Sequence, residues 1–338
     1  MRTAKPIGRL VDPAFWLLIG ALCFALLAAL GLATMEERRV RTLFVVVDLT
    51  RSMTARDYGE GVKARSRLDE AERVVTEIAR KLPCGSRIGL GLFTERRSFP
   101  LIEPVDICEN FPPFADAVAA LNWRMAWEGD SRVVRGLSSA QELVARLGAD
   151  LVFVTDGQEA PPLPVAGRRR AENPDTTAGV IIGAGGAKLV PIPKYDESGR
   201  AIGFYSLPDI AAGARVSIAT PGSTSGEYHP RNNPVGNLAA TSTEHLTQVR
   251  ETYLREIAAE AGLGYAPLGD LAAIEAALER HTGTDILEAP RSLSPIFAAA
   301  ALIFLIAAYG ANHLFAWRRG TAASRAKRNH PRTGAFRR

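Results

Sequence analysis

The chain has 338 residues, with 41 lysine or arginine and 36 aspartate or glutamate side chains, and a formal net charge of +5. The positive excess comes from residues 318–338, which contain eight basic residues and no acidic one. The middle of the chain is therefore mildly acidic. Since a basic folded domain is expected of nucleic-acid-binding proteins, this distribution argues against that class.

Two segments, residues 13–34 and 295–317, are apolar and long enough to cross a bilayer as helices. The alternative for the first is a cleaved signal peptide, but its apolar stretch of about 20 residues exceeds the roughly 7–15 of a typical signal peptide. Lysine and arginine flank the outer side of each segment. By the positive-inside rule we expect two membrane spans, with both chain ends cytoplasmic.

Between these spans, short apolar runs alternate with segments of helical spacing. The expected strands are residues 43–47, 88–93, 98–105, 151–154, 179–183 and a short one at Tyr265. The expected helices are residues 67–82, 113–121, 134–147, 246–261 and 270–279. Prolines in 98–105 favour an edge strand. The pattern predicts an α/β fold with a doubly wound, mostly parallel sheet, one antiparallel edge strand and a transmembrane helix at each end.

The predicted organisation has five parts and two insertions. It consists of a cytoplasmic N-terminus (1–12), a span (13–34), an exported domain (40–282), a second span (295–317) and a basic cytoplasmic tail (318–338). Insertions fall at about 188–205, which reads as a hairpin turning at 196–199, and at 206–244, which is rich in turn-forming residues. A loop as long as the second is usually either functional or disordered, and both alternatives stay open.

Cys84 and Cys108 flank the predicted 88–93/98–105 hairpin. In an antiparallel pair, the residue numbers of any two opposed residues add to the same total. For a turn at 94–97, the numbers of Cys84 and Cys108 add to this total within one. We therefore expect the two thiols to face each other within disulfide range. The alternative is two buried free cysteines, although bridges are common in oxidising compartments.

Two of the predicted strands end in aspartate, the first in Asp48 and the fourth in Asp156, and hydroxyls follow the first at Thr50 and Ser52. Carboxyl ends of parallel strands meet at one edge of a sheet, where ligands usually bind. Two aspartates there repel each other unless a positive charge lies between them. Carboxylate and hydroxyl oxygens suit Mg²⁺, with Mn²⁺ or Ca²⁺ as alternatives. The same residues could instead only cap helices and turns.

These residues resemble the metal-ion-dependent adhesion site of von Willebrand factor A (VWA) domains, whose pattern is D-x-S-x-S, then a distant threonine, then an aspartate. Asp48, Thr50 and Ser52 match the first element, Ser131 falls where the family has its threonine, and Asp156 matches the last. The resemblance implies an ion with an open position that an acidic side chain of a partner fills. Arg51, Trp127 and Asp130 are expected on the rim, although ordinary packing also explains a tryptophan.

A VWA domain between two spans resembles the bacterial VWA proteins associated with MoxR-type ATPases, including the BatA and BatB group. The stretches 48–53, 82–87 and 123–131 look most like MxaL-type proteins, which implies a place in the bacterial inner membrane with a periplasmic domain. It also implies a role in maturing periplasmic methanol dehydrogenase, including its Ca²⁺ insertion, with that enzyme, a maturation factor or other proteins of the cluster as partners. Alternatives are an adhesive or structural protein, or an envelope-stress factor. No acid/base pair is placed for catalysis, so we expect a non-enzyme.

Overall fold

The computed structural model describes residues 13–126, 131–160, 177–196, 198–209 and 245–328. The chain divides into two compact units. One is Arg39–Leu287, and the other combines the segments on either side of it. The first unit therefore corresponds closely to the domain predicted at 40–282.

A six-stranded sheet forms the centre of the Arg39–Leu287 unit, with strand order β11-β6-β5-β2-β3-β4 in the described part of the chain. The strands are β2 (Thr42–Asp48), β3 (Arg87–Thr94), β4 (Arg97–Asp106), β5 (Asp150–Thr155), β6 (Gly179–Gly183) and β11 (Gly264–Pro267). All neighbours pair in parallel except β3 and β4. The predicted mostly parallel sheet with one antiparallel edge strand is confirmed.

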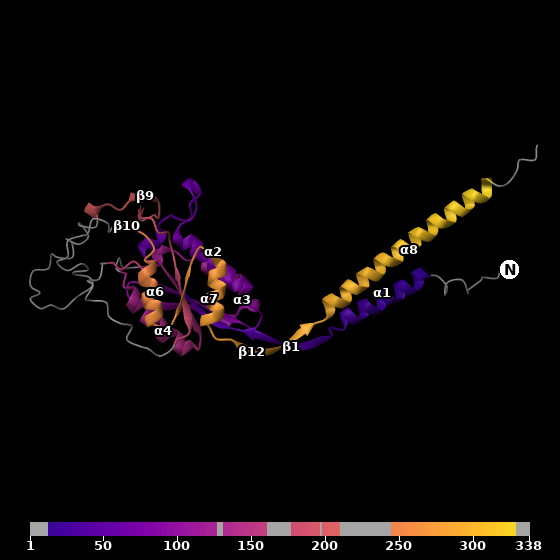
Figure 1. The fold of residues 1–338 in the computed structure, drawn as a ribbon, viewed down its shortest axis with the longest axis horizontal. Coiled ribbons are helices and arrows are strands. Elements are labelled where there is room, and N and C mark those ends of the chain that lie inside the picture. Colours follow the sequence, from indigo (N-terminus) through magenta and orange to yellow (C-terminus); the bar gives the residue numbers. More distant parts are fainter. Residues whose placement is uncertain (1–12, 127–130, 161–176, 197, 210–244, 329–338) are drawn as a thin grey trace, which may run out of the picture. The chain divides into compact units, whose positions relative to one another are not determined.

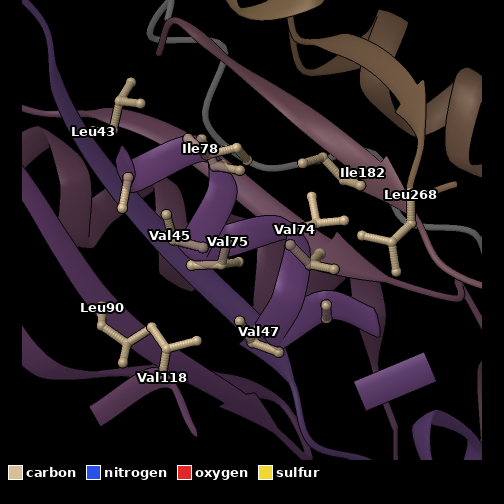
Figure 2. Packing of buried hydrophobic residues seen from close by; sticks show 14 of the residues in the cluster. Leu43, Val45, Val47, Val74, Val75, Ile78, Leu90, Val118, Ile182 and Leu268 are labelled. Carbon is tan, nitrogen blue, oxygen red and sulfur yellow. The ribbon is translucent and has the colours of Figure 1, made fainter. Parts of the chain in front are cut away.

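Helices cover both faces of this sheet (Figure 1). They are α2 (Arg67–Lys81), α3 (Ile107–Ala119) and α7 (Leu271–His281) on one face, and α4 (Val133–Leu147) and α6 (Glu251–Glu260) on the other. In β2, Val45 and Val47 pack against Val74 and Val75 of α2 on the first face of the sheet (Figure 2). Phe44 and Val46 point to the second face, which α4 and α6 cover. Both faces of β2 are thus buried, which explains its uninterrupted apolar run.

Two predicted helices begin elsewhere than expected. The helix predicted at 113–121 is α3, which starts at Ile107 because the Asp106 carboxylate accepts hydrogen bonds from the first backbone N–H groups. The helix predicted at 246–261 is wrong in its first turn. Leu246–Thr247 instead form the short strand β10, and the helix α6 begins at Glu251.

The predicted hairpin is present as β8 (Pro193–Tyr195) paired antiparallel with β9 (Ala201–Phe204). Its base is a second pair, in which β7 (Val190–Pro191) joins β10. The β7–β10 pair therefore joins the first insertion to the residues that directly follow the second insertion. Residues 210–244, the rest of the predicted long loop, lie outside the described residues.

The second unit contains α1 (Pro13–Ala29), α8 (Ser294–Arg328) and most of a two-stranded ribbon of β1 (Ala33–Val40) and β12 (Asp285–Ser292), whose far ends belong to the first unit. The Phe24 ring of α1 lies 5.3 Å from that of Phe304 and 6.5 Å from that of Phe297 in α8. A Cβ on Gly20 would lie 2.7 Å from Phe304, so a larger residue there would push the helices apart.

One helix in the described chain, with its window at Ser294–Ala311, is apolar and long enough to cross a membrane by length and composition. It contains the start of the predicted span 295–317. The other predicted span, 13–34, is wrong at its end: α1 stops at Ala29, Gly31 adopts a φ of +63°, and Ala33 already belongs to β1. The polar run that begins at Glu36 favours the ribbon over a longer helix.

The disulfide between Cys84 and Cys108 is present, with a Cα–Cα distance of 5.3 Å. The pairing of Phe93 with Ser98 has the predicted register, and irregularities further along β3 and β4 shift it by two before the open end. Cys108 lies in the first turn of α3 and not on the strand. The predicted disulfide is confirmed, but Cys108 is positioned by the first turn of α3 and not by a strand.

Candidate functional site

The loop after β2 folds tightly around the Asp48 carboxylate. Asp48 is fully buried, and one of its oxygens accepts a hydrogen bond from the Thr50 backbone N–H at 2.8 Å. Thr50 then caps the short 3-10 helix η1 (Arg51–Thr54), and its hydroxyl lies 3.3 Å from that of Ser52. The structure therefore brings Asp48, Thr50 and Ser52 together, as predicted, with all three side chains buried.

Asp156 reaches the same edge of the sheet from β5, which pairs with β2. The neighbouring Thr155 hydroxyl donates to the Asp48 carboxylate at 2.6 Å, so the ends of the two strands are tied directly. Asp156 accepts from the Gln158 backbone N–H at 2.9 Å. Thr155 was missed by the sequence analysis, although its place directly before Asp156 was a usable signal.

Ser131 lies between the loops that follow β3 and β5. Its backbone exchanges two hydrogen bonds with Ala160, at 2.8 and 2.9 Å, and forms a bridge to Glu95 on the other side. Because β3 and β5 flank β2 in the sheet, Ser131 belongs to the edge at which β2 ends. Its hydroxyl is buried and has no hydrogen-bond partner among the residues that the structure describes. An orphaned buried hydroxyl is uncommon and calls for an explanation such as an ion.

The electrostatics of the cluster favour a cation beside Asp48. Burial, and next the charge of nearby Asp156, raise the pKa of Asp48 to about 7. The hydrogen bonds from Thr155 and Thr50 act in the opposite direction and do not compensate. A carboxylate held in this way gains from any positive charge placed next to it.

A buried arginine that the sequence analysis missed, Arg67 at the start of α2, also reaches this edge. Its guanidinium donates to Asp156 at 2.7 Å, and on its other side to Asp57 at 2.8 Å. Thr247 of β10 accepts from Arg67 at 2.8 Å. These partners are 10 to 180 positions away in sequence, so no local spacing could have indicated them.

The rim of the site combines η1 with the β8–β9 hairpin. Arg51 is exposed, and its guanidinium carbon lies 5.4 Å from the Tyr205 ring centroid. The Trp123 ring, from the 3-10 helix η3 (Trp123–Met125), stacks on Tyr195 of β8 at 5.1 Å. Arg51 therefore lies beside the hairpin, and its role on a partner-binding rim stays a prediction. The other two predicted rim residues, Trp127 and Asp130, lie outside the described residues.

The donor set fits a hard divalent cation. It offers the buried Asp48 carboxylate, the hydroxyls of Thr50 and Ser52, and the unpartnered hydroxyl of Ser131. Three or more histidine, cysteine, aspartate or glutamate side chains that could hold a metal do not gather anywhere in the described ranges. An ion here would thus depend on hydroxyls as much as on carboxylates. Asp156, already bonded to Arg67 and Gln158, has less capacity left than Asp48.

Comparison with solved structures finds distant likenesses. An aerotolerance-related membrane protein from Bacteroides fragilis is 16% identical, with 71% of this chain and 99% of that chain covered and a TM-score of 0.43. BatB from Bacteroides thetaiotaomicron is 15% identical, with 71% and 98% covered and a TM-score of 0.45. A membrane-spanning protein from Vibrio fischeri is 16% identical, with 71% and 96% covered and a TM-score of 0.27. Such values carry no information on function.

No curated protein sequence matches the chain. A family model does match, and it covers the segment from β2 to the loop after β5, which contains Asp48, Thr50, Ser52, Ser131 and Asp156. Residues 43–158 of this chain match the von Willebrand factor type A domain.

Proposed function

We propose that this protein is a membrane-anchored module that binds another protein through a divalent cation, Mg²⁺ or alternatively Mn²⁺ or Ca²⁺, at the Asp48 cluster. The observation that carries the proposal is the buried Ser131 hydroxyl, which finds no hydrogen-bond partner within the described ranges and lies at the same sheet edge as Asp48. An ion would satisfy this hydroxyl and offset the charge of Asp48 at once. The match of residues 43–158 to a VWA domain supports the same reading.

The partner in this proposal contributes an acidic side chain. The ion, bound mainly by neutral hydroxyls and one well-placed carboxylate, would keep positive charge to attract a further carboxylate. The exposed Arg51 beside the ion-binding loop adds a second positive group on the rim. We assign the site to binding and not to catalysis, since its groups are arranged to hold an ion.

Adding millimolar Mg²⁺ to the purified full-length protein in detergent should raise its melting temperature relative to EDTA. Binding to the folded state alone stabilises by about 2.7 kcal/mol when the ion is at 100 times its dissociation constant. Ser131→Ala should reduce this gain. It should leave the melting temperature in EDTA unchanged or slightly higher, because the hydroxyl it removes has no partner.

Ser138→Ala is the matched control, since that hydroxyl only donates to the Val134 carbonyl within α4. It should retain the full Mg²⁺ gain. A wild-type melting temperature that is the same in Mg²⁺ and EDTA would rule the metal site out. An undiminished gain in Ser131→Ala would remove Ser131 from it.

For the location, we propose the bacterial inner membrane, with two spans, both ends cytoplasmic and the Arg39–Leu287 unit in the periplasm. The support is the apolar window Ser294–Ala311 of α8, which has the length and composition of a span, and the basic residues of 318–338 that follow this window. The Cys84–Cys108 disulfide suits an oxidising compartment. α1, which is apolar from Ala14 to Ala29, would form the other span.

The finer form of the proposal is that the partner is methanol dehydrogenase or one of its maturation factors, and that the module assists Ca²⁺ insertion. It rests on the resemblance of residues 48–53, 82–87 and 123–131 to MxaL-type proteins. Deleting the gene should then leave the dehydrogenase polypeptide in the periplasm but inactive. Added millimolar Ca²⁺ should restore part of the activity by mass action. Asp48→Ala should reproduce the deletion.

A deletion strain whose dehydrogenase is fully active in low-calcium medium would exclude this maturation role. The alternatives are then an adhesive or structural protein, or an envelope-stress factor, which would use the same metal site for another partner. Methanol dehydrogenase and MoxR-type genes beside this one would favour maturation.

A further inference from the structure

Arg67 is one of the most deeply buried residues of the protein, with a fully buried side chain. Its guanidinium is shared between two carboxylates. The Nε and one terminal nitrogen donate to Asp57 at 3.0 and 2.8 Å. The other terminal nitrogen donates to Asp156 at 2.7 Å and to the Thr247 hydroxyl at 2.8 Å. A charged side chain so placed is normally retained only with such partners.

The surrounding backbone closes the guanidinium off from water. Gly185, in the loop after β6, has a φ of +108°, and a Cβ there would lie 2.6 Å from the Arg67 Nε. The next residue, Gly186, donates its N–H to the Asp57 carboxylate at 3.0 Å. Only glycine allows this close approach. The positive charge of Arg67 is therefore fixed in place and little screened by solvent.

This fixed charge lies next to the candidate metal site through Asp156. Asp48 and Asp156 follow from paired strands, and the hydroxyl of Thr155, directly before Asp156, donates to Asp48 at 2.6 Å, so two carboxylates lie at one buried place and repel each other. Arg67 compensates part of that negative charge from the Asp156 side, whereas Asp48 accepts from two neutral groups, the Thr50 N–H and the Thr155 hydroxyl. A divalent ion and Arg67 would thus compete for the negative charge of Asp48 and Asp156.

We propose that Arg67 is a resident cation of the metal site, which lowers the site's affinity for divalent ions by neutralising Asp156. The inference rests on the proposed metal-dependent function. It makes Arg67 an affinity-setting residue that acts through Asp156 without touching the ion. A weakly held ion at the cluster then gains most when a partner carboxylate adds the missing negative charge.

The test is Mg²⁺ binding to the full-length protein in detergent, measured by calorimetry and by the melting temperature in Mg²⁺ and in EDTA. Arg67→Met should lower the melting temperature in EDTA, because Asp57 and Asp156 lose their buried partner. The same variant should bind Mg²⁺ about tenfold more tightly or better, since a nearby positive charge is gone. Its gain from Mg²⁺ should therefore exceed that of the wild type.

Two further variants separate this effect from a structural one. Arg67→Lys keeps the charge and should keep an affinity close to that of the wild type. Asp57→Asn removes the competing carboxylate, so more of the Arg67 charge acts on Asp156, and Mg²⁺ affinity should fall. Arg73→Met is the matched control in the same helix, where Arg73 pairs with Glu70. It should leave Mg²⁺ affinity unchanged. Asp57→Asn keeps the proposal testable if Arg67→Met does not fold.

The outcomes distinguish this inference from the proposed function. Tight Mg²⁺ binding by Arg67→Met, with no binding by the wild type, would support the resident cation and overturn metal dependence in the native protein. Equal affinity in the wild type, Arg67→Met and Asp57→Asn would overturn the inference and leave the metal site standing. Absence of binding in every variant would overturn both.

Discussion

Replacing Asp48 by asparagine should stabilise the metal-free protein at pH 8, whereas the same change at Asp156 should destabilise it. Burial and the charge of Asp156 raise the pKa of Asp48 to about 7, so its carboxylate is held against an unfavourable environment above that pH. Asparagine removes the charge. Its oxygen can still accept from the Thr50 N–H, and its amide can donate to the Thr155 hydroxyl. We expect a gain of about 1–3 kcal/mol.

At Asp156 the sign is reversed, because this carboxylate is the partner of Arg67. Asp156→Asn leaves the guanidinium buried with less negative charge around it, which destabilises a protein by about 3–5 kcal/mol. For a unit of this size, 1 kcal/mol corresponds to a melting-temperature change of about 2–4 °C. Loss of Mg²⁺ response in an Asp156 variant would therefore report damage to the fold as well as to the site.

The pH dependence provides the check on Asp48. Because its pKa is raised, Asp48 takes up a proton more readily in the folded protein than in the unfolded chain. The loss of folding stability that its buried charge causes is therefore complete above about pH 7 and shrinks as the pH falls. The advantage of Asp48→Asn in EDTA should accordingly be largest at pH 8 and small near pH 5. Asp106→Asn is the control, since asparagine caps a helix as well as aspartate. A lower melting temperature for Asp48→Asn at pH 8 would contradict the argument.

Converting Cys84 and Cys108 together to serine should lower the free energy of unfolding by about 3–4 kcal/mol, as expected for a bridge that closes a loop of this length. The bridge ties the segment after α2 to the start of α3, with β3 and β4 between them. Without the disulfide the unfolded chain has more conformational entropy, while the folded chain keeps the β3–β4 pairing.

Cys23→Ser is the control, because this free cysteine in α1 has no disulfide partner among the described residues. Its melting temperature should match that of the wild type. Mass spectrometry of the unreduced protein should find the Cys84 and Cys108 peptides joined. A double serine variant as stable as the wild type, or free alkylation of both thiols in the native protein, would contradict the prediction.

Strand and helix order could be predicted because each element carries its own signal. The run Leu43–Val47 is apolar throughout because both faces of β2 are covered, and Asp48 follows at once as the last residue of the strand before the loop. Parallel strands then place their ends at a common edge. Asp48 and Asp156 could be brought together on this reasoning alone, although 107 positions separate Asp48 from its bonded neighbour Thr155.

The parts that could not be predicted depend on pairs without a local pattern. Arg67 reads as the first residue of an amphipathic helix, a position at which an arginine is usually solvated. Its burial results from Asp57, Asp156 and Thr247, which three separate segments supply. Leu246 and Thr247 continue the apolar spacing of α6 in sequence, yet their backbone pairs with Val190 and Pro191. At Arg67 and at Leu246–Thr247, hydrogen bonds to residues distant in sequence therefore override what the local helical spacing predicts.

The ribbon of β1 and β12 has a mechanical consequence. The two segments through which the chain enters and leaves the Arg39–Leu287 unit are paired, and this pairing is extended by a Leu293 N–H to Leu32 hydrogen bond and an ion pair between Arg291 and Glu36. In the function proposed above, tension between a bound partner and the membrane would therefore divide over two neighbouring strands. It would not stretch the unit from one chain end to the other, because those ends are adjacent.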